Sequence, residues 1–319
     1  MRKNKDNMLN RMALHKGDKV GVLSTARWIE EQELEEANEL LRSWGLIPVY
    51  GKSIGAKFNQ FAGEDSLRAE NLQAFLDDPE IKAIICARGG YGTIRIIDRI
   101  DFTGFMANPK FICGYSDITV LHAHINDKLG LPTIHSTMPF SFSRNSMLAK
   151  QTLENALFGN ALNIQTEPHP LNNFGTAEGI LIGGNLSILY SLLGTRFGFS
   201  TAHKILFIED IDEYLYHIDR MMISLKLAGK LDAVKAIIVG GMTDMKDNKV
   251  KFGTSAEEII ATHVQPYNIP VCYGFPAGHI DDNRAMVFRK KSSITNNFKR
   301  HLIKLPIKKG SPLLMNLYI

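Results

Sequence analysis

Cysteine is scarce in this chain: its 319 residues include three, Cys86, Cys113 and Cys272. They are far apart, and each is embedded in an apolar run. The sequence therefore excludes a disulfide framework and predicts buried thiols in a reducing compartment. Long apolar stretches are also missing, since none approaches the roughly 18 residues that a membrane-spanning helix needs. We expect no membrane partner.

A strong charge of one sign is absent as well. The chain has 37 Lys and Arg against 33 Asp and Glu, a net charge of +4. Its basic cluster at residues 289–291 is short enough to be a solvated turn, so we expect no nucleic-acid partner. Residues 1–7 are basic, but no apolar segment follows them. This predicts a cytoplasmic protein without a secretory signal.

The first half of the chain alternates short apolar segments with amphipathic ones. Strands are predicted at residues 20–23, 47–50, 83–86 and 111–114, and helices at 31–44, 66–76, 93–99 and 119–129. This alternation is typical of an α/β fold with a parallel sheet that is covered on both faces. Polar residues at 24–25, 88–92 and 115–117 follow three of these strands. They should therefore face one crevice at the carboxyl ends of the sheet.

Residues 167–173 contain too many helix and strand breakers for regular structure. We therefore divide the chain into an N-terminal domain (1–160), a linker (161–178) and a C-terminal domain (179–319). The C-terminal part mixes its elements less regularly. Strands are predicted there at residues 179–182, 205–208, 236–239 and 271–273, and helices at 187–193, 218–227 and 255–263.

Ser116 stands in a glycine-containing turn between a predicted strand and a predicted helix. Such an elbow raises a hydroxyl above the edge of a sheet and directs backbone N–H groups toward it, which suits a nucleophile in acyl transfer. The usual G-x-S-x-G pattern is absent, and Ser116 could instead cap the following helix.

The segment RGGYG at 88–92 is a second glycine-rich turn. It lacks the third glycine of G-x-G-x-x-G and the Lys of a P-loop, so it resembles a phosphate cradle only weakly. Such glycines also allow a backbone N–H to approach an oxyanion closely. Arg88 could hold a substrate carboxylate or form an ion pair.

Two carboxylates, Glu209 and Asp210, end the apolar strand at 205–208. They could orient a histidine, bind a metal together with the nearby His217, or lie in a solvated turn. The segment lacks the ligand pattern of a calcium loop, and His217 and Asp219 would not face each other on a helix. We expect no metal.

His279 lies in a loop rich in Gly and Pro that follows a strand, where catalytic groups are often found. The other histidines that we considered are His122, His124 and His135. They lack the spacing of zinc ligands. We expect these three to be packing or surface residues.

Five segments together resemble the LD-carboxypeptidase family of serine peptidases, which also contains the microcin C self-immunity peptidases. They occur in the family's order and span roughly residues 15–305. The segments are ARGGYG (87–92), GYSDIT (114–119), GGNLS (183–187), LFIED (206–210) and GFPAGH (274–279).

The resemblance implies a catalytic triad of Ser116, Glu209 and His279. It also implies a flavodoxin-like N-terminal domain, a smaller β-rich α/β C-terminal domain, an active site between them and a homodimer. One departure concerns the segment after the histidine. Relatives often have N-x-x-L-P-x-G there, whereas residues 283–289 of this chain read NRAMVFR. The resemblance therefore does not predict which residues form the wall of the pocket beside His279.

From these residues we expect a serine carboxypeptidase that needs no cofactor. The backbone N–H groups of Gly90 and Asp117 would bind the oxyanion, while Arg88, Tyr91 and Asn185 would contact the substrate. The family's substrate is a murein tetrapeptide, cut between an L-centred diamino acid and the terminal D-alanine. The alternatives are a peptidase that acts on a peptide–nucleotide antibiotic, a non-catalytic peptide-binding protein and a flavin- or nucleotide-dependent α/β enzyme.

Overall fold

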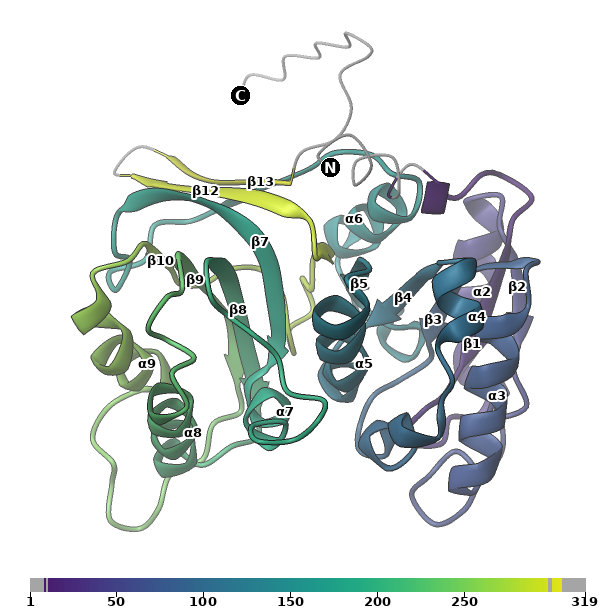
Figure 1. Ribbon diagram of the computed structural model, residues 1–319, viewed down its shortest axis with the longest axis horizontal. Helices are drawn as coiled ribbons and strands as arrows, with labels where there is room; N and C mark the ends of the chain where they lie inside the picture. Colours follow the sequence, from purple (N-terminus) through teal and green to yellow (C-terminus); the bar gives the residue numbers. More distant parts are fainter. Residues whose placement is uncertain (1–8, 10, 298–299, 306–319) are drawn as a thin grey trace, which may run out of the picture.

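A computed structural model describes residues 9, 11–297 and 300–305. Residues 1–7, which bear on the expected absence of a secretory signal, lie outside this part. The described chain forms two sheets that stand side by side, each with its own helices (Figure 1). Within these residues, no helix combines the length and apolar character that crossing a bilayer requires.

The first sheet has six strands in the order β11-β5-β4-β3-β1-β2. Five of them pair in parallel, and β11 pairs antiparallel with β5. The strands are β1 (Lys19–Leu23), β2 (Ile47–Tyr50), β3 (Ile81–Cys86), β4 (Phe111–Gly114), β5 (Thr133–His135) and β11 (Met286–Phe288). Strand β4 is fully buried, and in β3 only Lys82 is exposed, so both strands are mainly apolar in sequence.

Short helices and turns connect these strands. The α-helices are α2 (Glu35–Ser43), α3 (Asp65–Asp77), α4 (Thr103–Ala107), α5 (Thr119–His124) and α6 (Met147–Leu157). The other turns are η1 (Glu31–Leu34), η2 (Thr93–Arg95), η3 (Ile97–Arg99), η4 (Ser116–Ile118), η5 (Ile125–Leu129) and η6 (Pro139–Ser141). In Figure 1, α5 lies in the middle of the molecule, between the two sheets.

The second sheet has seven strands in the order β10-β9-β8-β7-β12-β13-β6. The four strands from β10 to β7 are parallel, and the rest of the sheet is antiparallel. The strands are β6 (Leu162–Thr166), β7 (Gly175–Asn185), β8 (Lys204–Ile211), β9 (Ala236–Thr243), β10 (Val271–Cys272), β12 (Lys291–Asn297) and β13 (Arg300–Leu305).

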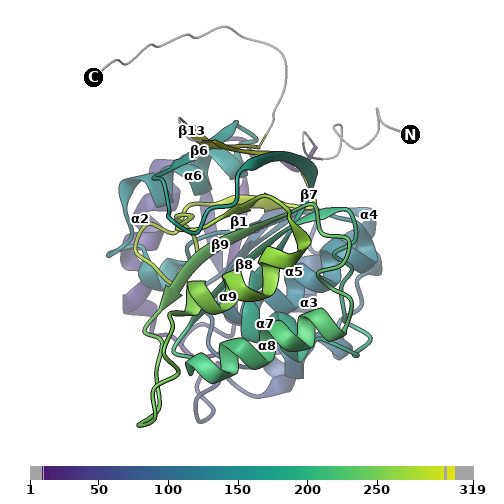
Figure 2. The same cartoon turned by 90° about the vertical axis from the view of Figure 1, so that its left-hand side faces the viewer.

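Three α-helices belong to this half: α7 (Leu186–Ser191), α8 (Leu215–Leu227) and α9 (Ala256–Val264), the last followed by the turn η7 (Gln265–Tyr267). Figure 2 shows α8 and α9 side by side in front of the parallel strands. The predicted two-part α/β architecture with a parallel N-terminal sheet is thus confirmed.

The two sheets share chain segments and core. Strand β11 comes from the C-terminal part of the sequence but completes the first sheet beside β5. One apolar cluster joins Ile134 and Phe288 of the first sheet to Phe207 of the second. Separating the halves would therefore break a strand pair and expose core side chains, which fixes the two sheets relative to each other.

Three predicted elements need correction. Residues 93–99 do not form an α-helix but two 3-10 turns, because their N–H groups bond three residues back. The predicted linker, 161–178, is not free of regular structure. Residues 162–166 form β6 and β7 begins at Gly175, and only the Pro-containing segment between them is irregular. The predicted helix at 119–129 is α-helical to His124 and continues as a π-helix.

Candidate active site

Ser116 occupies a strained elbow directly after β4. Its φ is +63°, in the left-handed region that costs a non-glycine residue about 1 kcal/mol. Gly114, at φ +150°, makes the turn possible, since a Cβ there would lie 2.9 Å from the Ile118 side chain. The residue that caps η4 is Tyr115, and Ser116 forms its first position. The helix-capping alternative for Ser116 is therefore wrong.

Three side chains from distant parts of the sequence form a hydrogen-bonded row. The hydroxyl of Ser116 lies 3.1 Å from Nε2 of His279, and Nδ1 of the same imidazole lies 2.7 Å from Oε2 of Glu209. With the proton on Nδ1, the histidine donates to the glutamate and can accept from the serine. This is the geometry of a nucleophile, a general base and an orienting acid.

Glu209 lies at an irregularity in the second sheet. The pairing of β8 with β9 changes register between Ile208 and Asp210, which is the effect of a β-bulge. The Glu209 carboxylate is fully buried. A Cβ added to Gly278 would lie 2.8 Å from the Cβ of Glu209. Glycine before His279 thus lets the histidine loop lie against the acid.

The charges around the imidazole favour its protonated form. Burial alone lowers the pKa of His279, but the adjacent Glu209 outweighs it, and the net shift is upward. Asp210 adds a smaller contribution in the same direction. Burial raises the pKa of Asp210 itself to about 7, and the neighbouring Glu209 adds to this. The site therefore stabilises the imidazolium that a general base becomes after it accepts a proton.

The glycine-rich turn after β3 lies against the serine. A Cβ on Gly89 would come within 3.2 Å of Ser116 Oγ and 3.5 Å of the backbone nitrogen of Asp117. Gly90 has φ +115° and is covered by the side chain of Arg27. The turn that carries Gly90 thus lies against Ser116 and Asp117 through Gly89, and the oxyanion-binding roles of Gly90 and Asp117 stay a prediction.

Asp117 also holds this turn in place through its side chain. Its buried Oδ2 accepts a hydrogen bond of 2.8 Å from the backbone N–H of Thr93. Burial raises the pKa of this carboxyl to about 6. Asp117 therefore links the serine elbow to the turn that follows the glycines.

Arg88 and Tyr91 lie at the border of the site. Arg88 is half-buried, donates to the backbone oxygen of Trp28 at 3.2 Å and makes no ion pair within the described chain. Its buried Nε also has no partner there. Tyr91 is 46% exposed and packs against Phe61. The ion-pair alternative for Arg88 is thus wrong, and both side chains can meet a ligand.

The structure gives Asn185 other partners than a substrate. Its amide nitrogen donates to Asp210 at 2.8 Å, and its oxygen accepts from Ile188 N–H as the cap of α7. The side chain is buried. Asn185 thus holds Asp210 next to Glu209, and its contact with a substrate stays a prediction.

Sequence reasoning missed the buried Arg68 beneath the glycine-rich turn. Its guanidinium donates to the backbone oxygens of Thr25 at 2.6 Å and Gly92 at 3.0 Å, and it pairs with Asp65. The side chain is fully buried. A signal was present, because Arg68 stands four residues before Leu72, on the inward face of the predicted helix.

Asn283 is a second residue that sequence reasoning did not use. It is buried, and its Oδ1 accepts a hydrogen bond of 2.8 Å from the N–H of Gly278. The same loop is held from the other half of the molecule, since Ser146 N–H and Asn145 Nδ2 both donate to the backbone oxygen of Asp281. The histidine loop is therefore fixed on both sides.

Replacing Asn283 by alanine should leave the buried N–H of Gly278 without a partner, at a cost of about 1–3 kcal/mol in the free energy of unfolding. Because the loop then shifts His279, we expect kcat to fall by about 10- to 100-fold. Thermal unfolding and hydrolysis rates measure both effects. Asn248→Ala, which removes the same atoms from an exposed loop, is the control. Unchanged kcat in Asn283→Ala would show that Asn283 does not position the histidine.

The remaining candidates have structural partners. His122 donates from Nε2 to the backbone oxygen of Gly114 at 2.8 Å, and His135 is buried among aromatic rings. His124 packs against Phe102 and Phe197, so the expectation that these three histidines are packing residues is confirmed. His217 pairs with Glu213. In the described part of the chain, no group of three or more His, Cys, Asp or Glu residues is arranged to hold a metal ion.

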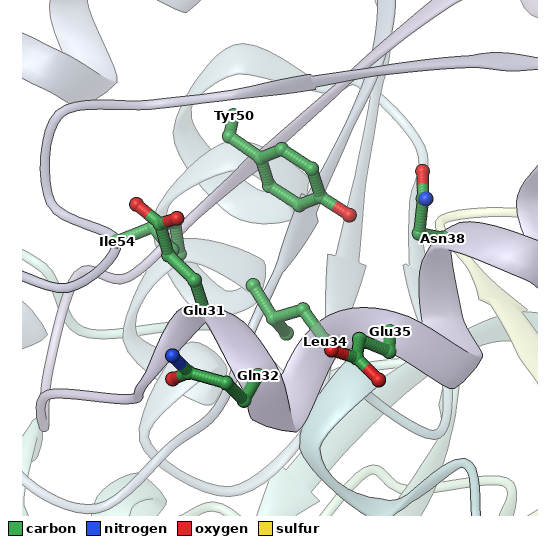
Figure 3. A pocket seen from close by; sticks show the side chains of 7 residues that line it. All are labelled: Glu31, Gln32, Leu34, Glu35, Asn38, Tyr50 and Ile54. Atoms are coloured by element: carbon green, nitrogen blue, oxygen red, sulfur yellow. The ribbon is translucent and has the colours of Figure 1, made fainter.

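A surface pocket lies away from this site. Figure 3 shows Tyr50 facing the side chains of η1 and α2 across it. Its lining contains two carboxylates, Glu31 and Glu35, and none of the residues predicted for the site. We assign it no part in the reaction.

The chain is similar in sequence to known proteins. Residues 20–136 match the family model of the LD-carboxypeptidase N-terminal domain, and residues 178–294 match that of the C-terminal domain. A probable murein peptide carboxypeptidase of Bacillus subtilis is 36% identical over 304 residues, which cover 94% of this chain and 95% of the relative.

Two solved structures share the fold. The muramoyltetrapeptide carboxypeptidase from Oxalobacter formigenes has a TM-score of 0.82 and 23% identity, covering 90% of this chain and 98% of that one. The microcin C7 self immunity protein MccF, in complex with aspartyl sulfamoyl adenosine, has a TM-score of 0.81 and 25% identity, covering 93% and 98%.

Proposed function

The chain belongs to the LD-carboxypeptidase family, and from this premise we propose that it is a serine carboxypeptidase of murein peptides. The bond cut joins the L-centre of a diamino acid to the terminal D-alanine of a tetrapeptide released during cell-wall recycling. The similarity to a probable murein peptide carboxypeptidase supports the choice of substrate.

One observation carries the proposal: the row of hydrogen bonds from Glu209 through His279 to Ser116. Peptide binding alone does not require a buried carboxylate aligned with an imidazole and a strained serine. A buried charge that is not needed is costly, and strain of this kind is typical of active sites. The non-catalytic alternative leaves both features unexplained.

In the first half of the proposed reaction, Ser116 Oγ attacks the carbonyl carbon of the diamino acid. His279 Nε2 takes the hydroxyl proton as the Oγ–C bond forms, and Glu209 stabilises the resulting imidazolium. The backbone N–H groups of Gly90 and Asp117 bind the oxyanion. His279 then gives its proton to the nitrogen of D-alanine, the C–N bond breaks, and an acyl-enzyme remains.

In the second half, water replaces D-alanine beside the histidine. His279 takes a proton from this water, whose oxygen attacks the acyl carbon. The proton then returns to Ser116 Oγ as the acyl bond breaks, which releases a tripeptide. The proposed products are one tripeptide and one D-alanine for each water consumed.

The raised pKa of His279 predicts the acid side of the pH profile. Because only the neutral imidazole can accept the proton of Ser116, kcat/KM should fall as the pH falls through this pKa, which Glu209 raises above the ordinary value of a histidine. Measuring kcat/KM from pH 5 to 9 tests this. Asp210 also titrates near this range. If the acid limb disappears in Asp210→Asn, the limb belongs to Asp210 and the expectation for His279 is wrong.

The proposed function is tested with the tetrapeptide L-Ala-γ-D-Glu-meso-diaminopimelate-D-Ala, by detecting free D-alanine with mass spectrometry. We expect release by the natural protein, none by Ser116→Ala and no effect of EDTA. The L-lysine tetrapeptide is assayed in parallel. If both peptides are inert, the murein-peptide proposal is wrong.

The second candidate function is a self-immunity peptidase that cleaves a peptide–nucleotide antibiotic. The likeness to the microcin C7 self immunity protein, bound to an aspartyl nucleoside, favours it. An aspartyl sulfamoyl adenosine substrate distinguishes the two. Its cleavage at a higher kcat/KM than that of either tetrapeptide would support this second function.

A further inference from the structure

Two arginines flank one phenylalanine ring beside the proposed active site. The guanidinium carbons of Arg88 and Arg144 lie 5.1 Å and 4.9 Å from the centre of the Phe140 ring. Arg88 directly precedes the glycine turn against Ser116. Sequence reasoning did not identify Arg144 or Phe140, because neither belongs to a motif that carries the family resemblance.

Arg144 belongs to a segment that is hydrogen-bonded to the histidine loop. The next two residues, Asn145 and Ser146, both donate hydrogen bonds to the backbone oxygen of Asp281, two positions after His279. Burial lowers the pKa of His279 and Glu209 raises it, and these are the larger effects. The positive charge of Arg144 adds a smaller lowering of the same pKa. The guanidinium is therefore within electrostatic reach of the catalytic imidazole.

Neither arginine is neutralised within the described chain. The sole carboxylate partner of Arg144 there is Asp281, at 3.9 Å, and the two side chains are 57% and 73% exposed. An ion pair so long and so exposed contributes little. Arg88 has a carbonyl partner and a buried Nε without one. Arg144 also interacts with the hydroxyl of Tyr115, which occupies part of its N–H donors. Because a guanidinium has five N–H donors, both arginines keep donors available for a ligand.

We propose that Arg88 and Arg144 together recognise a substrate with two carboxylates, one at its C-terminus and one on the side chain that precedes the cleaved bond. Arg88, next to the oxyanion turn, binds the terminal carboxylate of D-alanine. Arg144, at the more open rim, binds the side-chain carboxylate of the diamino acid. This inference rests on the proposed function and deepens it.

The chemistry separates two kinds of diamino acid. Meso-diaminopimelate carries a carboxylate beside its distal amine, whereas lysine ends in an ammonium alone. Arginine forms paired, charge-assisted hydrogen bonds with a carboxylate and repels an ammonium. One residue therefore both attracts the first substrate and disfavours the second, and specificity is the difference between these effects.

The test compares both tetrapeptides on the natural protein and on Arg144→Gln. We expect the natural protein to prefer the diaminopimelate peptide, and Arg144→Gln to lower kcat/KM for that peptide by about 10- to 100-fold, the range of a charge-assisted hydrogen bond. The value for the lysine peptide should stay the same or rise. Arg144→Lys keeps the charge but not the planar guanidinium. Its kcat/KM for the diaminopimelate peptide should lie between those of the natural protein and of Arg144→Gln.

Arg196→Gln is the matched control. Arg196 is exposed, lies 4.9 Å from the centre of the Phe197 ring and faces Asp98 at 3.8 Å, so its surroundings copy those of Arg144. We expect it to leave the ratio of the two kcat/KM values unchanged. An equal loss for both peptides in Arg144→Gln, or no preference in the natural protein, overturns the proposal.

A binding experiment separates this inference from the proposed function. In the Ser116→Ala background, calorimetry should show tighter binding of the diaminopimelate peptide, and adding Arg144→Gln should remove the difference. Selective binding without turnover by the natural protein would overturn the peptidase function but support Arg144 as the carboxylate-binding residue. Turnover of both peptides without selective binding would support the peptidase function but overturn the role of Arg144.

Discussion

Replacing Ser116 by alanine is expected to lower kcat by about four to six orders of magnitude, the loss seen when a triad nucleophile is removed. The hydroxyl lies 3.1 Å from His279 Nε2, so the substitution removes the oxygen that would form the acyl-enzyme. Binding of the tetrapeptide should persist, because the glycine turn and the arginines remain. Release of D-alanine measures the first effect and calorimetry the second.

The fold of Ser116→Ala should be unchanged. Alanine has the same Cβ, so the strain at φ +63° stays, and one hydrogen bond to a partly buried imidazole is lost. We expect the free energy of unfolding to change by no more than about 1 kcal/mol. A variant that unfolds normally and still cleaves at a near-natural rate would rule out the serine mechanism.

Glu209→Gln is expected to lower kcat by about three to four orders of magnitude, although it changes one atom. An amide that presents its NH₂ to Nδ1 forces that nitrogen to accept, so the proton moves to Nε2. The imidazole can then no longer take the proton of Ser116. Hydrolysis of the tetrapeptide by the purified variant measures this loss.

The same substitution should move the acid limb of the residual activity. Glu209 raises the pKa of His279 against the opposing effect of burial, so its removal leaves burial dominant and shifts the limb to lower pH. Glu213→Gln is the control, since Glu213 pairs with His217 and not with His279. If Glu213→Gln alone is damaging, the orienting acid has been assigned to the wrong residue.

Much of the fold could be predicted because it is encoded locally. Residues 83–86 of β3 and the whole of β4 appear as short apolar runs. The buried residues Ala37 and Leu41 of α2, with Leu34 just before the helix, recur at helical spacing. Boundaries were less predictable. Residues 93–99 have an apolar helical pattern, yet Thr93 N–H bonds to the carboxylate of Asp117. This partner lies outside any local window.

The crossing of the chain between the sheets could not be predicted either. Strand β11 follows the histidine loop in sequence, but its partner β5 lies about 150 residues earlier. Antiparallel pairing at the free edge of the first sheet depends on long-range packing and leaves no signature in three residues. For the same reason, nothing in the motif of Asn185 distinguishes a substrate contact from a bond to Asp210.

The sequence by itself determined the alternation of strands and helices in the first half and the residue types of the candidate triad. Short-range periodicity encodes the first, and motifs that stay contiguous in the chain carry the second. Only the tertiary structure decided how those residues meet. Glu209 and His279 are 70 positions apart, and a glycine and a loop fixed by both halves of the molecule allow them to lie 2.7 Å from each other. The tertiary structure alone also placed Arg144 beside the site, because distance between remote segments depends on contacts that no local pattern specifies.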